Sequence, residues 1–213
     1  MTMIKKQAKD VIGVFGTRGQ GKTAWIKEKV KTLSRVIILE NGNEEYDDMV
    51  DFTAHDKPEL AAALINRGQF KILYSNFDDE DPMSAMNEMC ELAEAYTKDI
   101  RDRFNVSLPV TLVIDEAQNW TSPWKTPPKL RRAIMQSRHL DFDIIYSTQR
   151  PSQISRNLTS QSNRFIIYSL AEPTDIKFFY GFIGADAARI LRLQKYHYLD
   201  CDLKTHEIIE KML

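Results

Sequence analysis

The sequence of 213 residues is 43% hydrophobic and 28% charged, a composition that excludes a disordered or fibrous chain and fits one globular domain. The formal net charge of −1 excludes a globally basic surface, so a nucleic-acid partner would have to be held by local patches. Cys90 and Cys201 lack the spacing of a zinc site or a disulfide framework, and we expect both to be buried as small hydrophobic side chains.

The apolar runs of the sequence are short. No stretch approaches the ~18 apolar residues of a membrane-spanning helix, and the apolar run at residues 11–15 is too short for the core of a secretory signal. We therefore expect a protein that is not secreted and has no membrane span of its own.

Hydrophobic periodicity predicts an alternation of strands and helices along the chain. The expected strands cover residues 11–15, 35–39, 70–75, 111–114, 143–147, 164–169 and 195–200, and the expected helices cover residues 24–33, 58–66, 82–104 and 129–136. We expect residues 76–81 to form an acidic, solvated loop before a helix, and we expect no metal site there. The alternation predicts a single α/β domain over residues 1–213, with a mostly parallel sheet, helices on both faces, and the C-terminal segment 196–213 completing the sheet.

A complete phosphate-loop motif follows the first expected strand. Residues 16–23, GTRGQGKT, match G-x-x-x-x-G-K-[ST] and open the first expected helix, which is the context that the motif requires. Backbone N–H groups and the helix N-terminus suit phosphate binding, with Lys22 reaching the β- and γ-phosphates and Thr23 coordinating magnesium. We predict that ATP contacts Gly16, Thr17, Arg18, Gly19, Gln20, Gly21, Lys22, Thr23 and Ala24. The alternative is a chance glycine turn before a helix.

A pair of acids ends the strand at residues 111–114. Asp115 and Glu116 lie at the carboxyl end of an apolar strand, where open α/β sheets place their ligands. In this Walker B pattern Asp115 would hold magnesium through water, and Glu116 would polarise the attacking water. The alternative is that the two acids only cap the next element.

Gln149 stands at the tip of the strand at residues 143–147. A polar side chain there can adjoin the γ-phosphate, sense the nucleotide or position the attacking water. Read alone, residues 147–149 could also be an ordinary strand end.

Three segments together resemble the FtsK and HerA superfamily of DNA-pumping ATPases. They are GTRGQGKT, TLVIDEAQ and SRHLDFDIIYSTQRPSQISRNLTSQSNRFIIYSL, which lie within residues 11–170, and STQRP is the most specific part. The short chain looks most like the genome-packaging ATPases of internal-membrane, tectivirus-like viruses. That resemblance implies a RecA-like fold, a hexameric ring, duplex DNA in the pore, partners at a capsid vertex or in the viral membrane, and a place in the host cytoplasm or virion. A weaker resemblance connects the same motifs to assembly ATPases of the zonula-occludens-toxin type.

A ring motor needs a group that couples neighbouring subunits. Arg138, just before the strand that leads to Gln149, lies near the position where the superfamily is expected to carry an arginine that acts on the neighbour's ATP. Arg150, Arg164 and Arg189 are the competitors, and a surface salt bridge is the alternative role for Arg138.

A basic and aromatic stretch follows Glu116 and is a candidate DNA contact. It comprises Trp120, Trp124, Lys125, Lys129, Arg131 and Arg132. The alternative is that the tryptophans pack beside prolines and the cations form a solvated helix face.

These patterns favour an ATP-hydrolysing, sequence-nonspecific translocase of double-stranded DNA that uses magnesium, as in a viral packaging motor. The first alternative is a filamentous-phage-type extrusion ATPase that works on a coat or membrane partner. A P-loop kinase for small molecules is disfavoured because a kinase does not need a water-activating acid such as Glu116. A binding-only switch is disfavoured by the intact Lys22 and Glu116.

Overall fold

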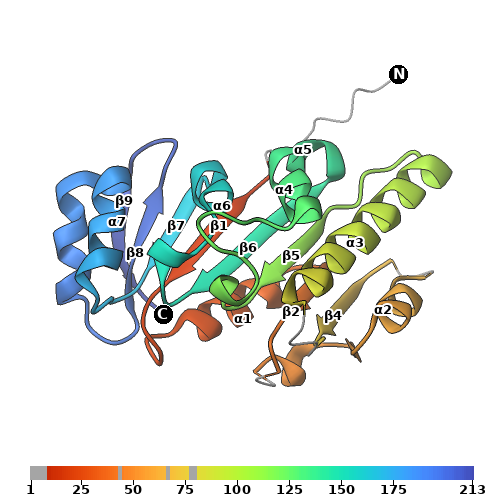
Figure 1. The fold of residues 1–213 in the computed structure, drawn as a ribbon, viewed down its shortest axis with the longest axis horizontal. Coiled ribbons are helices and arrows are strands. Elements are labelled where there is room, and N and C mark those ends of the chain that lie inside the picture. The colour runs from red at the N-terminus through yellow and green to blue at the C-terminus, as the bar shows by residue number, and fades with distance from the viewer. Residues whose placement is uncertain (1–8, 43–44, 66–67, 77–80) are drawn as a thin grey trace.

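The computed structural model describes residues 9–42, 45–65, 68–76 and 81–213, and these form a sheet with the strand order β3-β4-β2-β5-β6-β1-β7-β8-β9 (Figure 1). The strands are β1 (Val11–Phe15), β2 (Arg35–Leu39), β3 (Phe52–Ala54), β4 (Phe70–Tyr74), β5 (Val110–Ile114), β6 (Phe142–Thr148), β7 (Arg164–Ile167), β8 (His197–Asp202) and β9 (Ile208–Met212). Strands β1 to β7 run parallel, and β8 and β9 are added antiparallel at one end. The mostly parallel sheet expected from the sequence is confirmed.

The helices are α1 (Lys22–Lys31), α2 (Lys57–Leu64), α3 (Pro82–Phe104), α4 (Pro128–Met135), α5 (Ser137–Leu140), α6 (Arg156–Gln161) and α7 (Pro173–Ile183). Side-chain caps explain where several begin. Asp56 accepts a hydrogen bond from the N–H of Glu59 at the start of α2, and Asp81 accepts one from Met83 at the start of α3. Helix α3 ends at Asn105, which adopts the left-handed conformation that terminates many helices.

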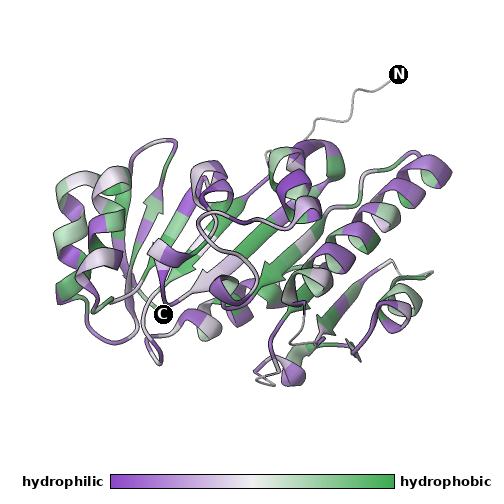
Figure 2. Ribbon diagram, in the orientation of Figure 1, coloured by the Kyte–Doolittle hydropathy of each residue, from purple (hydrophilic) through white to green (hydrophobic). Residues whose placement is uncertain are grey.

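Alternate residues of each parallel strand face two separate hydrophobic clusters. In β1, Val11 and Phe15 point into the larger cluster, which helices α2 to α7 cover, whereas Ile12 and Val14 point into the smaller one, which α1 covers through Trp25. Figure 2 shows the consequence, because the central strands are largely hydrophobic while the helices carry hydrophilic stripes. Burial on both faces accounts for the continuous apolar strands in the sequence.

Most expected elements are present with small shifts in their ends. The structure adds β3, α5, α6 and α7, which were not expected, and it begins β8 two residues later than expected. The delay occurs because Tyr196 has a φ of 67° and belongs to a turn. The expectation that residues 196–213 complete the sheet is confirmed by β8 and β9. Residues 77–80 of the acidic loop lie outside the described residues.

Both cysteines are free and buried, as expected. Within the described ranges, no helix combines the length and apolar character needed to span a membrane.

Candidate nucleotide site

The loop between β1 and α1 has the curled backbone that the phosphate-loop motif predicts. Gly16, Gly19 and Gly21 have φ values of 154°, 76° and 121°, which residues other than glycine rarely adopt. The N–H of Trp25 donates to the carbonyl of Gly21 at 2.9 Å and closes the first turn of α1. Backbone N–H groups of the loop and of the first helical turn are therefore available to an anion.

Close packing beneath the loop fixes its position on the sheet. A Cβ on Gly16 would lie 2.6 Å from the Cβ of Tyr168, which directly follows β7. The N–H of Thr17 also donates to the carbonyl of Ser169 at 3.0 Å. The residues that follow β7 therefore pack against the phosphate loop and hold it in place.

Lys22 is buried at the centre of the site. Its Nζ donates to the carbonyl of Gly16 at 2.9 Å and lies 3.8 Å from Oε1 of Glu116. Burial lowers the pKa of Lys22, and the charges of Glu116 and Asp115 oppose that change. The ammonium group is thus within reach of both the phosphate loop and the acid pair.

Asp115 is 5% exposed at the carboxyl end of β5. The hydroxyl of Ser147 donates to its Oδ1, and the same Ser147 oxygen accepts a hydrogen bond of 3.0 Å from the N–H of Glu116. Burial raises the pKa of Asp115 to about 6, while the Ser147 hydrogen bond opposes the rise. A cation beside this carboxylate would favour its ionised form.

Glu116 is held on both carboxylate oxygens by amide donors. Gln149 donates to Oε1 at 2.7 Å, and Gln118 donates to Oε2 at 2.7 Å. Gln118 is itself fixed by the hydroxyl of Thr148, which donates to its Oε1 at 2.6 Å. Glu116 also has a left-handed backbone with a φ of 46°, which is strained for a residue other than glycine. The strain and the two donors together specify the direction of one carboxylate.

Thr23 and Asp115 both line the cavity over the loop, and their oxygen atoms suit Mg²⁺. The hydroxyl of Thr23 donates to Oε2 of Glu45 at 2.7 Å, which leaves its lone pairs available to a metal ion. Within the part of the chain that the structure describes, no three His, Cys, Asp or Glu side chains group as a metal site. Magnesium would therefore be held by Thr23 and Asp115 together with the phosphates of a nucleotide.

The cavity has a volume of about 480 Å³. It is lined by Arg18, Gly19, Gly21, Lys22, Thr23, Ala24, Glu45, Asp115, Glu116, Gln149 and Tyr196. The structure thus brings together the loop, the acid pair and Gln149, as the sequence predicted, although Gly16, Thr17 and Gln20 are not part of the lining.

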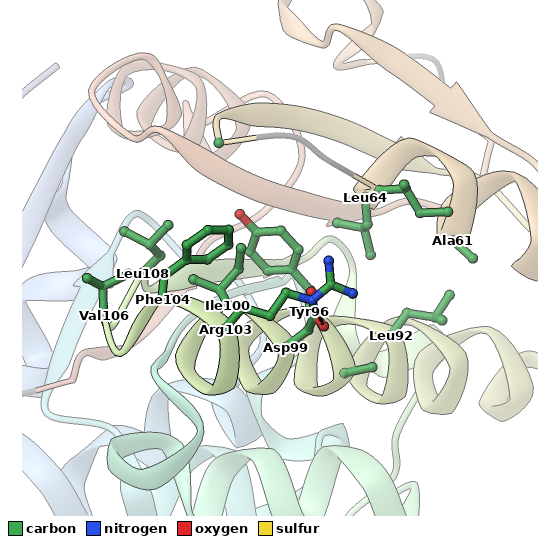
Figure 3. Close-up of a pocket in the computed structure, with 13 residues that line it drawn as sticks. Ala61, Leu64, Leu92, Tyr96, Asp99, Ile100, Arg103, Phe104, Val106 and Leu108 are labelled. Carbon is green, nitrogen blue, oxygen red and sulfur yellow. Dashed lines mark ion pairs between the residues drawn. The ribbon is translucent and has the colours of Figure 1, made fainter.

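A second, apolar cavity of about 760 Å³ lies between α2 and α3 (Figure 3). Its lining includes Leu64, Tyr96, Phe104 and Leu108, and Leu108 leads into the amino end of β5. The phosphate loop follows the carboxyl end of β1, so the second cavity is not part of the nucleotide site.

Arg138 is exposed on α5, before the amino end of β6. The seven residues of β6, at about 3.3 Å each, separate it by roughly 20 Å from the edge that carries the cavity. It has no ion-pair partner among the described residues. Of the competing arginines, Arg150 pairs with Asp175, Arg164 with Asp200, and Arg189 with Asp186 and Glu210. Arg138 therefore does not line the nucleotide cavity of its own chain.

The candidate DNA contacts separate into buried and exposed side chains. Trp120 is 2% exposed and donates through Nε1 to the carbonyl of Asp115 at 2.9 Å, so its interpretation as a surface contact is wrong. Trp124 is 86% exposed, and the guanidinium of Arg156 lies 5.5 Å from its ring centroid. Lys125 and Arg131 are exposed, Lys129 is half-buried, and Arg132 pairs with Glu94.

Several site residues were not identified from the sequence. Gln118 and Ser147 adjoin the recognised motifs, and their positions at the carboxyl ends of β5 and β6 could have suggested them. Glu45 comes after β2 and Tyr196 precedes β8, so both lie outside the recognised motifs in sequence.

The sequence is similar to one protein family and to one curated protein. Residues 79–165, less than half of the chain, match the family model of zonular occludens toxin (Zot). The DNA double-strand break repair helicase HerA of Sulfurisphaera tokodaii is 26% identical over 146 residues, which make up 66% of this chain and 29% of HerA. The chain thus spans less than a third of the length of this curated relative.

Solved structures share the fold over nearly the whole chain. The genome packaging NTPase B204 from Sulfolobus turreted icosahedral virus 2, in complex with ATP-gammaS, has a TM-score of 0.78 and 21% identity, covering 96% of this chain and 98% of B204. VirB4 of Thermoanaerobacter pseudethanolicus has a TM-score of 0.64 and 11% identity, covering 100% of this chain and 91% of VirB4. The fold shared with B204 confirms the P-loop NTPase fold, and the sequence similarity to HerA confirms the resemblance to the FtsK and HerA superfamily that the motifs indicated.

Proposed function

We propose that this protein hydrolyses ATP with Mg²⁺ and uses the energy to move double-stranded DNA without sequence preference, as the motor that packages a viral genome. The observation that carries the proposal is the placement of Glu116. The side-chain amides of two glutamines donate to its carboxylate, and its Oε1 lies 3.8 Å from the Nζ of Lys22. A fixed carboxylate next to the expected γ-phosphate is what hydrolysis requires, because water must be deprotonated as it attacks.

Each residue of the site has a distinct part in the proposed reaction. Lys22 binds the β- and γ-phosphates, and Thr23 and Asp115 hold the magnesium ion, which neutralises phosphate charge when bound. Glu116 accepts the proton of the attacking water. Gln149, which donates to Glu116, is positioned to orient that water or to register the γ-phosphate.

The exposed Trp124 and Arg156 form the best candidate for a DNA grip. An aromatic ring and a guanidinium on one surface can hold a sugar-phosphate backbone without reading bases. The loop that carries Trp124 begins at Trp120, whose indole is hydrogen-bonded to the backbone of Asp115. Movement of the acid pair during hydrolysis would therefore be transmitted to the exposed loop.

Two of the similar proteins support the part of the proposal that concerns DNA. B204 is a genome packaging NTPase and HerA is a DNA helicase, and this chain shares the fold of the first and sequence similarity with the second. We propose a hexameric ring that acts in the host cytoplasm or the virion with partners at a capsid vertex or in the viral membrane. In such a ring, Arg138 reaches the ATP of the neighbouring subunit.

An assembly ATPase that extrudes filamentous phage is the second candidate, and the Zot family match over residues 79–165 favours it. The two candidates differ in their substrate. A DNA motor requires duplex DNA for full activity, whereas an extrusion ATPase requires a coat or membrane protein.

Phosphate release with and without duplex DNA separates the candidates. We expect duplexes of unrelated sequence to stimulate hydrolysis equally, with an effect that declines as salt increases, because the contacts are ionic. Trp124→Ala should reduce the stimulation and leave basal hydrolysis unchanged, whereas Tyr180→Ala, which removes another exposed aromatic ring, should do neither. Absence of stimulation by any duplex, in protein that forms rings and hydrolyses ATP, would favour the extrusion ATPase.

A further inference from the structure

Tyr196 lines the nucleotide cavity although it lies far from every sequence motif of the site. Its N–H donates to the carbonyl of Gln20 at 3.2 Å, and its carbonyl accepts from the N–H of Leu213 at 3.0 Å. Its φ of 67° is a left-handed conformation that is costly for a tyrosine. Hydrogen bonds to the phosphate loop and to the residue after β9 thus hold the backbone of Tyr196 in a strained conformation. This conformation directs the ring toward the nucleotide cavity.

The order of strands indicates which part of a nucleotide meets Tyr196. Glu116 and Gln149 follow β5 and β6, on one side of β1, and they define the end of the site where the γ-phosphate reacts. Tyr196 precedes β8, on the other side of β1. Because β8 is antiparallel to β7, its first residue lies at the same edge as the phosphate loop.

The distances across the sheet fit the length of a nucleotide. Strands β1 and β8 are two positions apart, which at about 4.8 Å for each position gives roughly 10 Å. A nucleotide whose phosphates lie on the loop, with the γ-phosphate toward Glu116, extends its ribose and base in the opposite direction. That direction leads to Tyr196.

The ring has the exposure and contacts of a stacking surface. It is 44% exposed, and a Cβ on Gly21 would lie 3.1 Å from its Cδ1, so the ring borders the phosphate loop directly. The ammonium of the exposed Lys195 lies 4.9 Å from the ring centroid. Aromatic side chains stack on nucleobases, and replacing such a side chain by alanine typically costs about 1–3 kcal/mol of binding energy for each base.

We propose that Tyr196 is the platform on which the base of the bound nucleotide stacks. This proposal deepens the proposed function by naming the base subsite of the same cavity, but it depends only on nucleotide binding. Stacking needs a flat aromatic face and no particular pattern of donors, so ATP and GTP bind through Tyr196 to a similar degree.

The test compares ligands with and without a base on the nucleotide-free protein. The variants are Tyr196→Leu, which removes the ring, and Tyr196→Phe, which keeps it. Calorimetry with Mg²⁺ measures the Kd of a non-hydrolysable ATP analogue, the matching GTP analogue and inorganic tripolyphosphate, which has no base.

We expect Tyr196→Leu to weaken both analogues by about 5-fold to about 150-fold, the equivalent of the stacking energy, and to leave tripolyphosphate binding unchanged. Tyr196→Phe should bind all three ligands as the parent does. If Tyr196→Leu weakens tripolyphosphate as much as the analogues, the residue only supports the loop, and the proposal is overturned. Unchanged analogue binding would overturn it as well. No DNA is present, so a failure of the proposed DNA translocation would leave these results unaffected.

Discussion

The burial of Asp115 predicts that its carboxylate destabilises the nucleotide-free protein at neutral pH. Its pKa is raised from 3.8 to about 6, chiefly by burial. At neutral pH the group is ionised in an environment that disfavours the charge. Asp115→Asn retains the shape of the side chain and an oxygen that can accept from Ser147, and it removes the charge.

The size of the effect follows from the two pKa values. The unfolded carboxyl releases its proton near pH 3.8 and the folded one near pH 6, so the parent loses stability as the pH increases through this window. Two pKa units, at about 1.4 kcal/mol each, give a loss of about 3 kcal/mol that is complete above the folded pKa. Asp115→Asn has no such loss, so its free energy of unfolding should exceed that of the parent by up to about 3 kcal/mol at pH 7.5.

Urea denaturation between pH 4 and pH 8, without nucleotide or Mg²⁺, measures this difference. The two proteins should be about equally stable near pH 4 and should diverge as the pH increases. Asp102→Asn, at an exposed carboxylate on α3, is the matched control and should change stability by less than about 0.5 kcal/mol.

A second measurement on the same variant connects stability to function. Asp115→Asn should lose magnesium-dependent hydrolysis although it is more stable, since Asp115 is a proposed magnesium ligand. An Asp115→Asn variant that is less stable than the parent at pH 7.5, or that has the same advantage in stability at pH 4 and pH 7.5, would show that the buried charge does not destabilise the protein.

Three further predictions concern the acid pair, the phosphate loop and the coupling between subunits. Glu116→Gln should keep ATP bound and reduce phosphate release by roughly 10²-fold to 10⁴-fold, and turnover at the parental rate would show that another group activates the water. Gly16→Ala should abolish nucleotide binding in a calorimetric titration, because the new methyl group meets Tyr168 at 2.6 Å, and parental affinity would show that the loop can move. Mixing inactive Arg138→Ala with inactive Lys22→Ala should partly restore hydrolysis, since a mixed ring pairs an intact loop with an intact arginine. Normal hydrolysis by Arg138→Ala alone, or no recovery in rings shown to be mixed, would assign the trans role to another arginine.

The sequence predicted the centre of the fold and of the site because both are encoded locally. Strand β1, the glycine loop and α1 form one continuous segment, and the apolar strand before Asp115 is recognisable from its residues alone. Helix α3 was expected with the observed bounds, since it is long and strongly periodic.

Elements whose formation depends on distant contacts were missed. Strand β3 has three residues and exists through its pairing with β4, so the sequence alone gives it no clear signal. The same limit applies to the site. Tyr196 is held at the cavity by backbone hydrogen bonds to Gln20 and Leu213 that no local pattern encodes. Trp120 is buried in the larger hydrophobic cluster, where its indole donates to the backbone of Asp115.

Displacement of a third strand from a DNA triplex tests the central claim most directly, because it reports movement along duplex DNA and not hydrolysis alone. The parent protein with ATP and Mg²⁺ should displace the strand from duplexes of unrelated sequence, and Glu116→Gln should bind ATP and displace nothing. If the parent hydrolyses ATP at a DNA-independent rate and never displaces the strand, the protein is not a DNA translocase.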